Sequence, residues 1–384
     1  MSDATDQAPE QITLFDGQPK YQAFCRMQEL VPTSRMESSS GPFEFEEGDA
    51  IALPAHYDHR GTVKSVEDLI EATHTSAIFV LQDGKVRFEH YWRTGGRDVP
   101  WMSMSVAKSF ISALVGIACE RELISGLDDQ IADYVPILKG SGFDGATIEN
   151  VLQMSSGVQF REDYADPDSE ISQMSRAIAG GESLDSFIAS LQRKAEPGTI
   201  CEYSSADTQA LGMLLRAVTG RPIAEYMHEQ LCEPLGMESP SYWLVDSTGM
   251  ELAFAGMLMT ARDFAKIGEL YRLGGKWGRE QIVPAAYVAG SIVANRPHLQ
   301  PGEPRVGGER FPLGYGYQWW IPAGEIGEFS AIGVYNQFVY VDPSRNAVVV
   351  KLSANPRYGT SHDDTDNKDD ETIFLLRAIC QALD

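Results

Sequence analysis

Residues 101–110 read WMSMSVAKSF and place Ser105 three residues before Lys108 inside an apolar run. Apolar side chains recur at helical spacing through this run and leave almost no polar face, so the sequence predicts a buried helix over 103–123. A serine and a lysine three residues apart on a helix lie on one face, one turn from each other. A lysine in such a helix has little access to water and needs an explanation.

Ser105 and Lys108 have the chemistry of a nucleophile and a base. Ser105 lies in the first helical turn, where unpaired backbone N–H groups and the helix dipole favour a developing oxyanion. Desolvation lowers the pKa of an ammonium group, so Lys108 can act as a neutral amine. The motif alone is weak, because about one or two Ser-x-x-Lys matches are expected by chance in a chain of this length. The alternative is a capped helix whose lysine extends its side chain to water.

The composition describes a large folded protein with a strong negative charge. The chain has 384 residues, 43% of them hydrophobic, and a net charge of −24. This length suffices for one large domain or two closely packed ones. The negative charge argues against nucleic acid and anionic membranes as partners, because both attract basic proteins.

Other features of the sequence bear on the compartment. No apolar run reaches the eighteen residues that a transmembrane helix needs. Residues 1–20 lack the basic and apolar regions of a secretory signal. The five cysteines are scattered and form no C-x-x-C pair, which is typical of reduced thiols. We therefore expect a cytoplasmic protein.

The predicted elements run as strands, then helices, then strands again. Residues 77–92 contain two β-rich runs around Asp83-Gly84, which is a hairpin signal. Strands return at 337–354, before a last helix over 371–383. If the first and last strands share one antiparallel sheet, the fold is α+β with a cleft between two lobes. We expect an N-terminal arm (1–60) packed on the body, an α/β lobe (61–124 and 300–384) and a mostly helical lobe (125–299).

Four further motifs follow the Ser-x-x-Lys helix in a fixed order. Together with MSVAKSF they resemble the serine β-lactamase-like family, which includes class C β-lactamases, penicillin-binding carboxypeptidases and related esterases. Five ordered matches make a chance resemblance implausible. The resemblance implies a β-lactamase/transpeptidase-like fold, in which helices flank an antiparallel sheet and a mostly helical lobe is inserted. The four motifs are VLQMSSGVQF (151–160), EPGTICEYSSADTQALG (196–212), EPLGME (233–238) and AFAGMLMTARDFAKIG (253–268).

Within this family, three other stretches resemble the 6-aminohexanoate-dimer (nylon-oligomer) hydrolase branch. This likeness extends into the N-terminal arm, and it suggests the branch without fixing the substrate. The stretches are REDYADPDSE (161–170), GYGYQWW (314–320) and AIGVYNQFVYVDP (331–343).

The resemblance implies the catalytic roles. Ser105 matches the acylated nucleophile, and Lys108 matches the lysine that takes or relays its proton. Tyr203 matches the tyrosine of the Y-x-N motif, and we expect Lys108 to favour its phenolate, which then shuttles protons to the leaving group. Gly333 aligns with the glycine of the family's K-T-G or H-x-G strand. The backbone N–H groups of Ser105 and of the following Val334 then form the oxyanion hole.

Two departures from the family pattern bear on the substrate. Ala331 replaces the cationic or imidazole residue that β-lactamases and penicillin-binding proteins place on this strand to recognise a substrate carboxylate. Ser205 replaces the asparagine of Y-x-N. Both departures favour a linear ester or amide over a β-lactam.

The resemblance also implies substrate contacts near Ser105. Tyr164 matches a tyrosine on a mobile loop that contacts the scissile amide in the nylon-oligomer branch. We also expect substrate contacts from Ser205, Gly333 and Trp319; Trp319 or Trp320 lines the acyl pocket, and core packing is the alternative for one of them. Acidic residues surround Tyr164 and either favour a cationic substrate end or form a solvated loop. These residues are Glu162, Asp163, Asp166, Asp168 and Glu170.

No metal or cofactor site is predicted. HDDTDNKDDE (362–371) lacks the central glycine and final glutamate of an EF-hand, so we interpret it as a solvated acidic loop. His56 and His59 have no further ligands at a suitable spacing. No glycine-rich phosphate loop follows a strand, so no nucleotide cofactor is implied.

The sequence therefore predicts a serine hydrolase that cleaves a small-molecule linear amide or ester through an acyl-enzyme. One alternative is a β-lactamase or D-Ala-D-Ala carboxypeptidase. Another is a non-catalytic scaffold or binding protein of the same fold, although such proteins usually lose one of the three catalytic residues that this chain keeps. The oligomeric state is left open.

Overall fold

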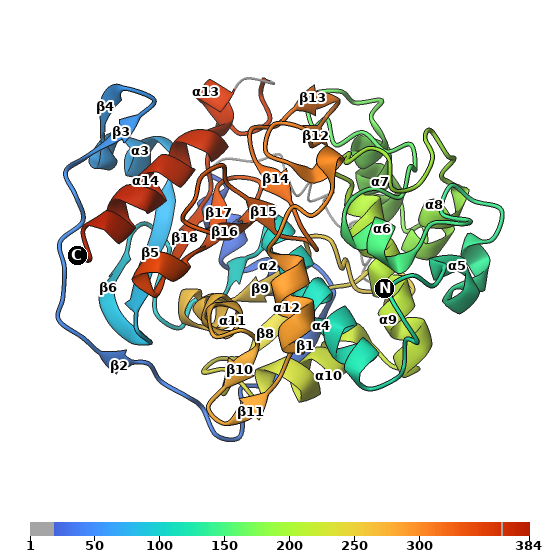
Figure 1. The fold of residues 1–384 in the computed structure, drawn as a ribbon, viewed down its shortest axis with the longest axis horizontal. Coiled ribbons are helices and arrows are strands. Elements are labelled where there is room, and N and C mark those ends of the chain that lie inside the picture. Colours follow the sequence, from blue (N-terminus) through green and yellow to red (C-terminus); the bar gives the residue numbers. More distant parts are fainter. Residues whose placement is uncertain (1–18, 362–363) are drawn as a thin grey trace, which may run out of the picture.

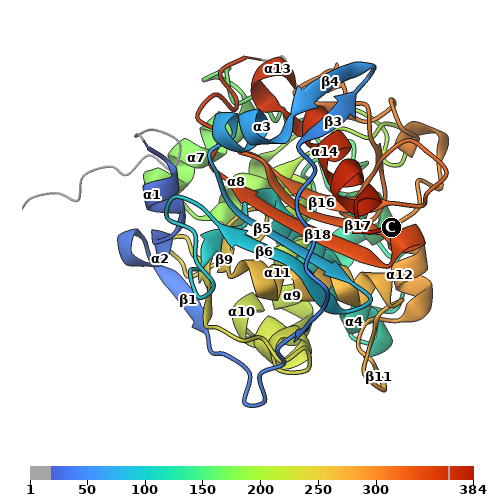
Figure 2. The same ribbon diagram turned by 90° about the vertical axis from the view of Figure 1, so that its left-hand side faces the viewer.

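The computed structural model describes residues 19–361 and 364–384. Its largest sheet has the strand order β14-β15-β16-β17-β18-β5-β6-β2. β5 (Thr75–Gln82) pairs antiparallel with β18 (Ala347–Ser353), so the first and last long strands share one sheet, as predicted (Figure 2). The other pairs are antiparallel except β2 with β6. The remaining strands are β2 (Glu46–Glu47), β6 (Lys85–Tyr91), β14 (Gly314–Tyr315), β15 (Trp320–Ile321), β16 (Phe329–Gly333) and β17 (Gln337–Asp342).

Helices cover both faces of this sheet. α11 (Ala261–Arg272) packs on β5, β17 and β18, and α14 (Asp369–Gln381) packs on β17 and β18 from the opposite side (Figure 1). The central strands are therefore buried on both faces and read as continuous apolar runs. The predicted hairpin at Asp83-Gly84 is confirmed, with φ values of 52° and 72° that suit a type I′ turn.

The helices between the two halves of the sheet gather beside it (Figure 1). At their centre α9 (Ser205–Thr219) packs against α4 (Ala107–Glu120), the buried helix predicted around Lys108. Gly220 ends α9 with φ 69°, a left-handed conformation that glycine adopts without cost. The helices that pack on α9 are α5 (Ile131–Tyr134), α6 (Ile148–Leu152), α8 (Leu184–Ser190) and α10 (Ile223–Met227), and α7 (Glu170–Ala179) packs on α8.

The segment 125–299 also contains strands that the sequence did not predict. β8 (Ser241–Leu244) and β9 (Met257–Met259) belong to a second sheet with the order β1-β8-β9-β7. Strands of three or four residues are too short to show an alternating pattern, so tertiary pairing decides them. The outer strands are β1 (Thr33–Met36), from the N-terminal arm, and β7 (Trp101–Met102), just before Ser105.

Short elements complete the described chain. The hydroxyl of Ser65 accepts the N–H of Asp68 and caps the start of α3 (Val66–Ala72). The helices are α1 (Tyr21–Phe24), α2 (Met27–Leu30), α12 (Ala285–Ser291) and α13 (Asp364–Asn367), with a π-helical turn at His228–Cys232. The strands are β3 (His56–His59), β4 (Thr62–Ser65), β10 (Lys276–Trp277), β11 (Glu280–Gln281), β12 (Arg305–Val306) and β13 (Glu309–Arg310).

The interpretation of 362–371 as a solvated loop is wrong where the structure describes it. Residues 362 and 363 lie outside the described residues, as do residues 1–18, which carry most of the segment judged for a secretory signal. The rest enters α13 and α14, and Asp370 and Glu371 are buried. The β3-β4 hairpin supplies their countercharges: Arg60 Nε lies 2.9 Å from Asp370 Oδ2, and Lys64 Nζ lies 2.9 Å from Glu371 Oε2. None of the helices in the described part of the chain is long and apolar enough to span a bilayer.

Candidate active site

Ser105 lies in a strained turn between β7 and α4. The turn is a 3₁₀ helix, Met104–Val106, and Met104 has φ 45°, a left-handed conformation that is costly for a side chain of this size. β16 passes directly beside it. A Cβ atom on Gly333 would lie 2.7 Å from the carbonyl oxygen of Ser103 and 2.9 Å from the backbone N of Ser105. The glycine therefore allows β16 to approach the nucleophile closely.

Lys108 points at Ser105 from a water-excluded position. The residue is 1% exposed, and its Nζ lies 3.0 Å from Ser105 Oγ, 3.1 Å from Ser205 Oγ and 2.8 Å from the carbonyl oxygen of Phe254. Burial lowers the pKa of Lys108 to about 8, against an opposing effect of the Glu162 charge. The alternative of a lysine that extends to water is wrong. A neutral Lys108 amine can donate two hydrogen bonds and accept the proton of Ser105.

Glu162 is a buried member of this site, although the sequence analysis groups it with the other acidic residues around Tyr164. It is 3% exposed. Its Oε1 accepts the hydroxyl of Ser205 at 2.7 Å and that of Tyr164 at 2.6 Å, and its Oε2 accepts the N–H of Ser205 at 3.0 Å. Ser205 therefore donates to Glu162 and accepts from Lys108. Nothing in REDYADPDSE distinguishes Glu162 from its acidic neighbours, because its partner lies 43 residues away.

The other acidic residues predicted around Tyr164 have an environment different from that of Glu162. Asp166 lies 2.8 Å from Arg161 Nη2, and Glu170 accepts the backbone N–H of Arg161 at 2.9 Å. Asp163 lines the cavity beside Ser105, whereas Asp168 is exposed. The acidic segment is thus a set of local contacts around one buried carboxylate.

Tyr203 faces Ser105 from the start of α9. Its ring stacks on Trp320 at a centroid distance of 5.1 Å, and Lys108 Nζ lies 5.1 Å from the same ring. Burial and then the charge of Glu162 raise the pKa of Tyr203 well above its usual value, while a hydrogen bond with Ser105 acts in the opposite direction. Burial and the charge of Glu162 therefore favour a neutral phenol at Tyr203 over the expected phenolate.

The predicted substrate contact of Trp319 is wrong. Trp319 is fully buried and packs on Tyr271 and Phe329 at centroid distances of 4.6 and 5.2 Å, so it is a core residue. Its neighbour Trp320 lines the cavity at Ser105. Ala331 is also buried in the core, so this position presents no side chain to the cavities described below.

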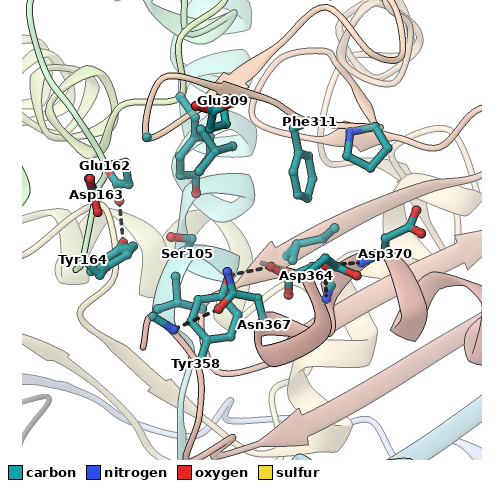
Figure 3. A pocket seen from close by; sticks show the side chains of 18 of the residues that line it. Ser105, Glu162, Asp163, Tyr164, Glu309, Phe311, Tyr358, Asp364, Asn367 and Asp370 are labelled. Atoms are coloured by element: carbon teal, nitrogen blue, oxygen red, sulfur yellow. Dashed lines mark hydrogen bonds between the residues drawn. The ribbon is translucent and has the colours of Figure 1, made fainter. Parts of the chain in front are cut away.

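Two cavities meet at Ser105. The first has a volume of about 340 Å³ and a mixed lining that includes eight charged residues, and we call it the polar cavity (Figure 3). The second has a volume of about 430 Å³ and a mostly apolar lining, and we call it the apolar cavity. Ser105, Tyr164 and Val334 line both. Tyr203 and Gly333 line only the polar cavity, whereas Ser205 lines only the apolar one.

The site therefore brings together most of the predicted residues. Ser105, Lys108, Tyr203, Ser205, Gly333 and Val334 converge, Tyr164 lies beside them, and Trp319 does not contribute. Within the described ranges, no three His, Cys, Asp or Glu side chains are grouped so that they could hold a metal ion.

A protein-family model described as "Beta-lactamase" matches residues 64–372, which is most of the chain. The chain belongs to the beta-lactamase family. A 6-aminohexanoate-dimer hydrolase from Paenarthrobacter ureafaciens is 30% identical to this family member over 351 residues, covering 88% of this chain and 86% of that relative.

Solved structures show the same beta-lactamase fold. A Bacillus anthracis protein described as a candidate 6-aminohexanoate-dimer hydrolase superposes with a TM-score of 0.83 at 23% identity, covering 98% of both chains. EstCE1, described as a hydrolase with promiscuous acyltransferase activity, superposes with a TM-score of 0.64 at 19% identity, covering 83% of this chain and 96% of that one.

Proposed function

We propose that this beta-lactamase-family protein is a serine hydrolase that cleaves a linear amide or ester through an acyl-enzyme. The observation that carries the proposal is the 3.0 Å contact between Lys108 Nζ and Ser105 Oγ in a buried site. A lysine whose pKa is near 8 is partly neutral at physiological pH and can accept the hydroxyl proton. Serine alone is a weak nucleophile, so this base is what makes Ser105 reactive.

The first half of the reaction forms the acyl-enzyme. Lys108 takes the proton of Ser105 as the Oγ–carbon bond forms. The backbone N–H groups of Ser105 and Val334 stabilise the oxyanion, which is usually the largest single catalytic contribution. The bond to the leaving oxygen or nitrogen then breaks, and that atom receives the proton of the Tyr203 hydroxyl. The proton on Lys108 restores Tyr203.

The second half releases the acid. Water attacks the carbonyl carbon of the acyl group on Ser105. The protons move in the reverse order, so that Tyr203 takes the proton of the water and Lys108 returns a proton to Ser105 as the ester bond breaks. A neutral Tyr203 suits this role, because a phenol can donate a proton to the leaving atom directly. Every proton in the two half-reactions is supplied and taken up by these residues, the substrate or water.

Substrate preference follows from three observations. The relative from Paenarthrobacter ureafaciens carries the name 6-aminohexanoate-dimer hydrolase. β16, with the sequence FSAIG, carries no cationic or imidazole side chain that could bind a substrate carboxylate. The Ser205 hydroxyl is occupied by Lys108 and Glu162. These features favour a linear amidase or carboxylesterase over a β-lactamase or D-Ala-D-Ala carboxypeptidase.

The polar cavity suits a polar leaving group, because eight charged residues line it. Its charged residues are Glu162, Asp163, Glu309, Asp364, Asp369 and Asp370 against Arg60 and Arg310.

The test compares wild type with Ser105→Ala on a short p-nitrophenyl ester, the linear 6-aminohexanoate dimer and a chromogenic cephalosporin. Ser112→Ala is the matched control, because Ser112 lies on the same helix but contacts Tyr287. We expect wild type and the control to cleave the ester and the dimer, and Ser105→Ala to cleave neither. Cleavage of the ester alone would restrict the function to an esterase, and preference for the cephalosporin would favour a β-lactamase. An active Ser105→Ala protein, or an inactive wild type, would refute the proposal, the latter in favour of a scaffold.

A further inference from the structure

The two cavities at Ser105 differ in chemistry, and this difference bears on how a substrate lies in the site. The side chains of Met104, Leu252 and Phe254 line the apolar cavity, together with Ile178 from α7 and Val31 from the N-terminal arm. Its charged lining residues are engaged elsewhere: Arg176 donates to the carbonyl of Pro167 at 2.6 Å, and Asp246 accepts the N–H of Leu184 at 2.8 Å.

Only one cavity contains the proposed proton donor. Tyr203 lines the polar cavity and not the apolar one, although Ser105 lines both. A general acid must lie within hydrogen-bond reach of the atom that it protonates. The leaving oxygen or nitrogen must therefore lie on the side of the polar cavity.

The geometry of the attacked carbon then fixes the place of the acyl chain. A tetrahedral intermediate at Ser105 carries four substituents: Oγ, the oxyanion, the leaving atom and the acyl chain. The oxyanion lies at the N–H groups of Ser105 and Val334, and the leaving atom faces Tyr203. Of the two cavities described at Ser105, the apolar one is left for the acyl chain.

We propose that the apolar cavity binds the acyl chain, and that the preferred substrates are esters or amides of aliphatic acids. The polar cavity receives the alcohol or amine. This inference rests on the proposed function and extends it to a substrate class and an orientation. A cavity of about 430 Å³ has the size of a small-molecule site, and apolar lining stabilises methylene groups removed from water.

Two series of esters test the orientation. The first varies the acyl chain from acetyl to octanoyl with a fixed p-nitrophenyl group. The second varies the alkyl alcohol over the same lengths with a fixed acetyl group. Rates are normalised to alkaline hydrolysis of each ester. We expect kcat/KM to rise about fourfold for each added acyl methylene until the cavity is filled, and to change little along the alcohol series.

Matched variants assign the effect to a cavity. Ala179 ends α7 at the apolar cavity, and Glu309 lies on β13 at the polar cavity; both are exposed, so a larger side chain is compatible with folding. We expect Ala179→Phe to lower kcat/KM about tenfold for octanoyl esters while sparing acetyl esters. Glu309→Phe should leave the profile of the acyl series unchanged and alter the alcohol series.

The outcomes separate the orientation from the proposed function. A rise along the alcohol series that Ala179→Phe abolishes, or no rise along the acyl series, would overturn the orientation while Ser105-dependent hydrolysis persists. Hydrolysis that survives Ser105→Ala throughout both series would overturn the proposed function instead.

Discussion

Lys108 and Glu162 are joined through a single hydroxyl group. Ser205 Oγ lies 3.1 Å from Lys108 Nζ and 2.7 Å from Glu162 Oε1. The buried carboxylate thus stabilises the protonated lysine and opposes the effect of burial, which leaves the pKa of Lys108 at about 8. Without Glu162 the amine would lose its proton at lower pH.

This relationship predicts the pH dependence of the enzyme. The reaction needs neutral Lys108, so kcat/KM should rise with pH through an acid limb near pH 8. Glu162→Gln keeps an oxygen that can accept from Ser205 but removes the charge that raises the pKa of Lys108. The acid limb of kcat/KM should therefore move to lower pH.

The control for this variant is Glu170→Gln. Glu170 lies on the same segment but accepts from the backbone of Arg161 and does not belong to the lining of either cavity at Ser105. Its pH profile should match that of wild type. An acid limb that stays in place in Glu162→Gln would contradict the assigned role of the carboxylate.

Tyr203→Phe tests the phenol as proton donor. The variant keeps the ring that stacks on Trp320 and removes only the hydroxyl. Loss of a general acid typically lowers the rate by about 10²- to 10⁴-fold. We expect this loss in kcat for an alkyl ester or amide and a smaller loss for a p-nitrophenyl ester, whose anion leaves without a proton.

Tyr315→Phe is the matched control. Tyr315 contacts the same indole at a centroid distance of 4.7 Å but does not line either cavity at Ser105. Its kinetics should remain close to wild type for both substrates. Equal losses on both substrates in Tyr203→Phe would point to a structural role for that hydroxyl.

Gly333→Ala tests the close approach of β16 to the nucleophile. The added methyl group would lie 2.7 Å from the Ser103 carbonyl and 2.9 Å from the Ser105 nitrogen, so backbone must shift. A shift of about 1 Å in a catalytic group costs about 10²-fold in rate. We expect kcat/KM to fall by about this factor while far-UV circular dichroism is unchanged. Gly126→Ala, where no atom lies within 4 Å of the added Cβ, should retain activity.

Much of this site could be predicted because its signals are local. Ser105 and Lys108 lie three residues apart, and the Asp83-Gly84 turn depends on neighbouring residues alone. The resemblance to a family then supplied Tyr203 and Gly333, which are distant in sequence.

The predictions fail where tertiary contacts determine the burial or the charge state of a residue. The sequence neighbours of Glu162 are polar and acidic, as on a protein surface. The residue is buried in the fold, where it bonds with Ser205. The charge state of Tyr203 depends on burial, which the sequence does not specify. Trp319 and Trp320 are adjacent, but Trp319 is in the core and Trp320, at the start of β15, lines the cavity, and the sequence does not show which of the two faces the site.

Lys351 provides a test of stability against pH. This residue on β18 is fully buried and donates to Ser353 Oγ at 2.7 Å and Thr73 Oγ1 at 3.0 Å. Burial lowers its pKa from 10.5 to about 7, with Asp369 opposing. Between these two values the unfolded state holds the proton and the folded state does not. The contribution of Lys351 to the free energy of unfolding should therefore become more favourable as pH rises from about 7 to 10, by up to about 1.4 kcal/mol per pH unit.

Lys351→Met removes this titration and keeps an unbranched chain of similar length. Urea unfolding of both proteins at several pH values gives the difference in free energy of unfolding. The advantage of the variant should be largest below pH 7, where wild type buries a charge, and should shrink as pH rises. Lys139→Met is the control, because Lys139 is exposed and its substitution should give a difference that varies little with pH. A pH-independent difference for Lys351→Met would mean that the unfolded and folded states bind this proton equally.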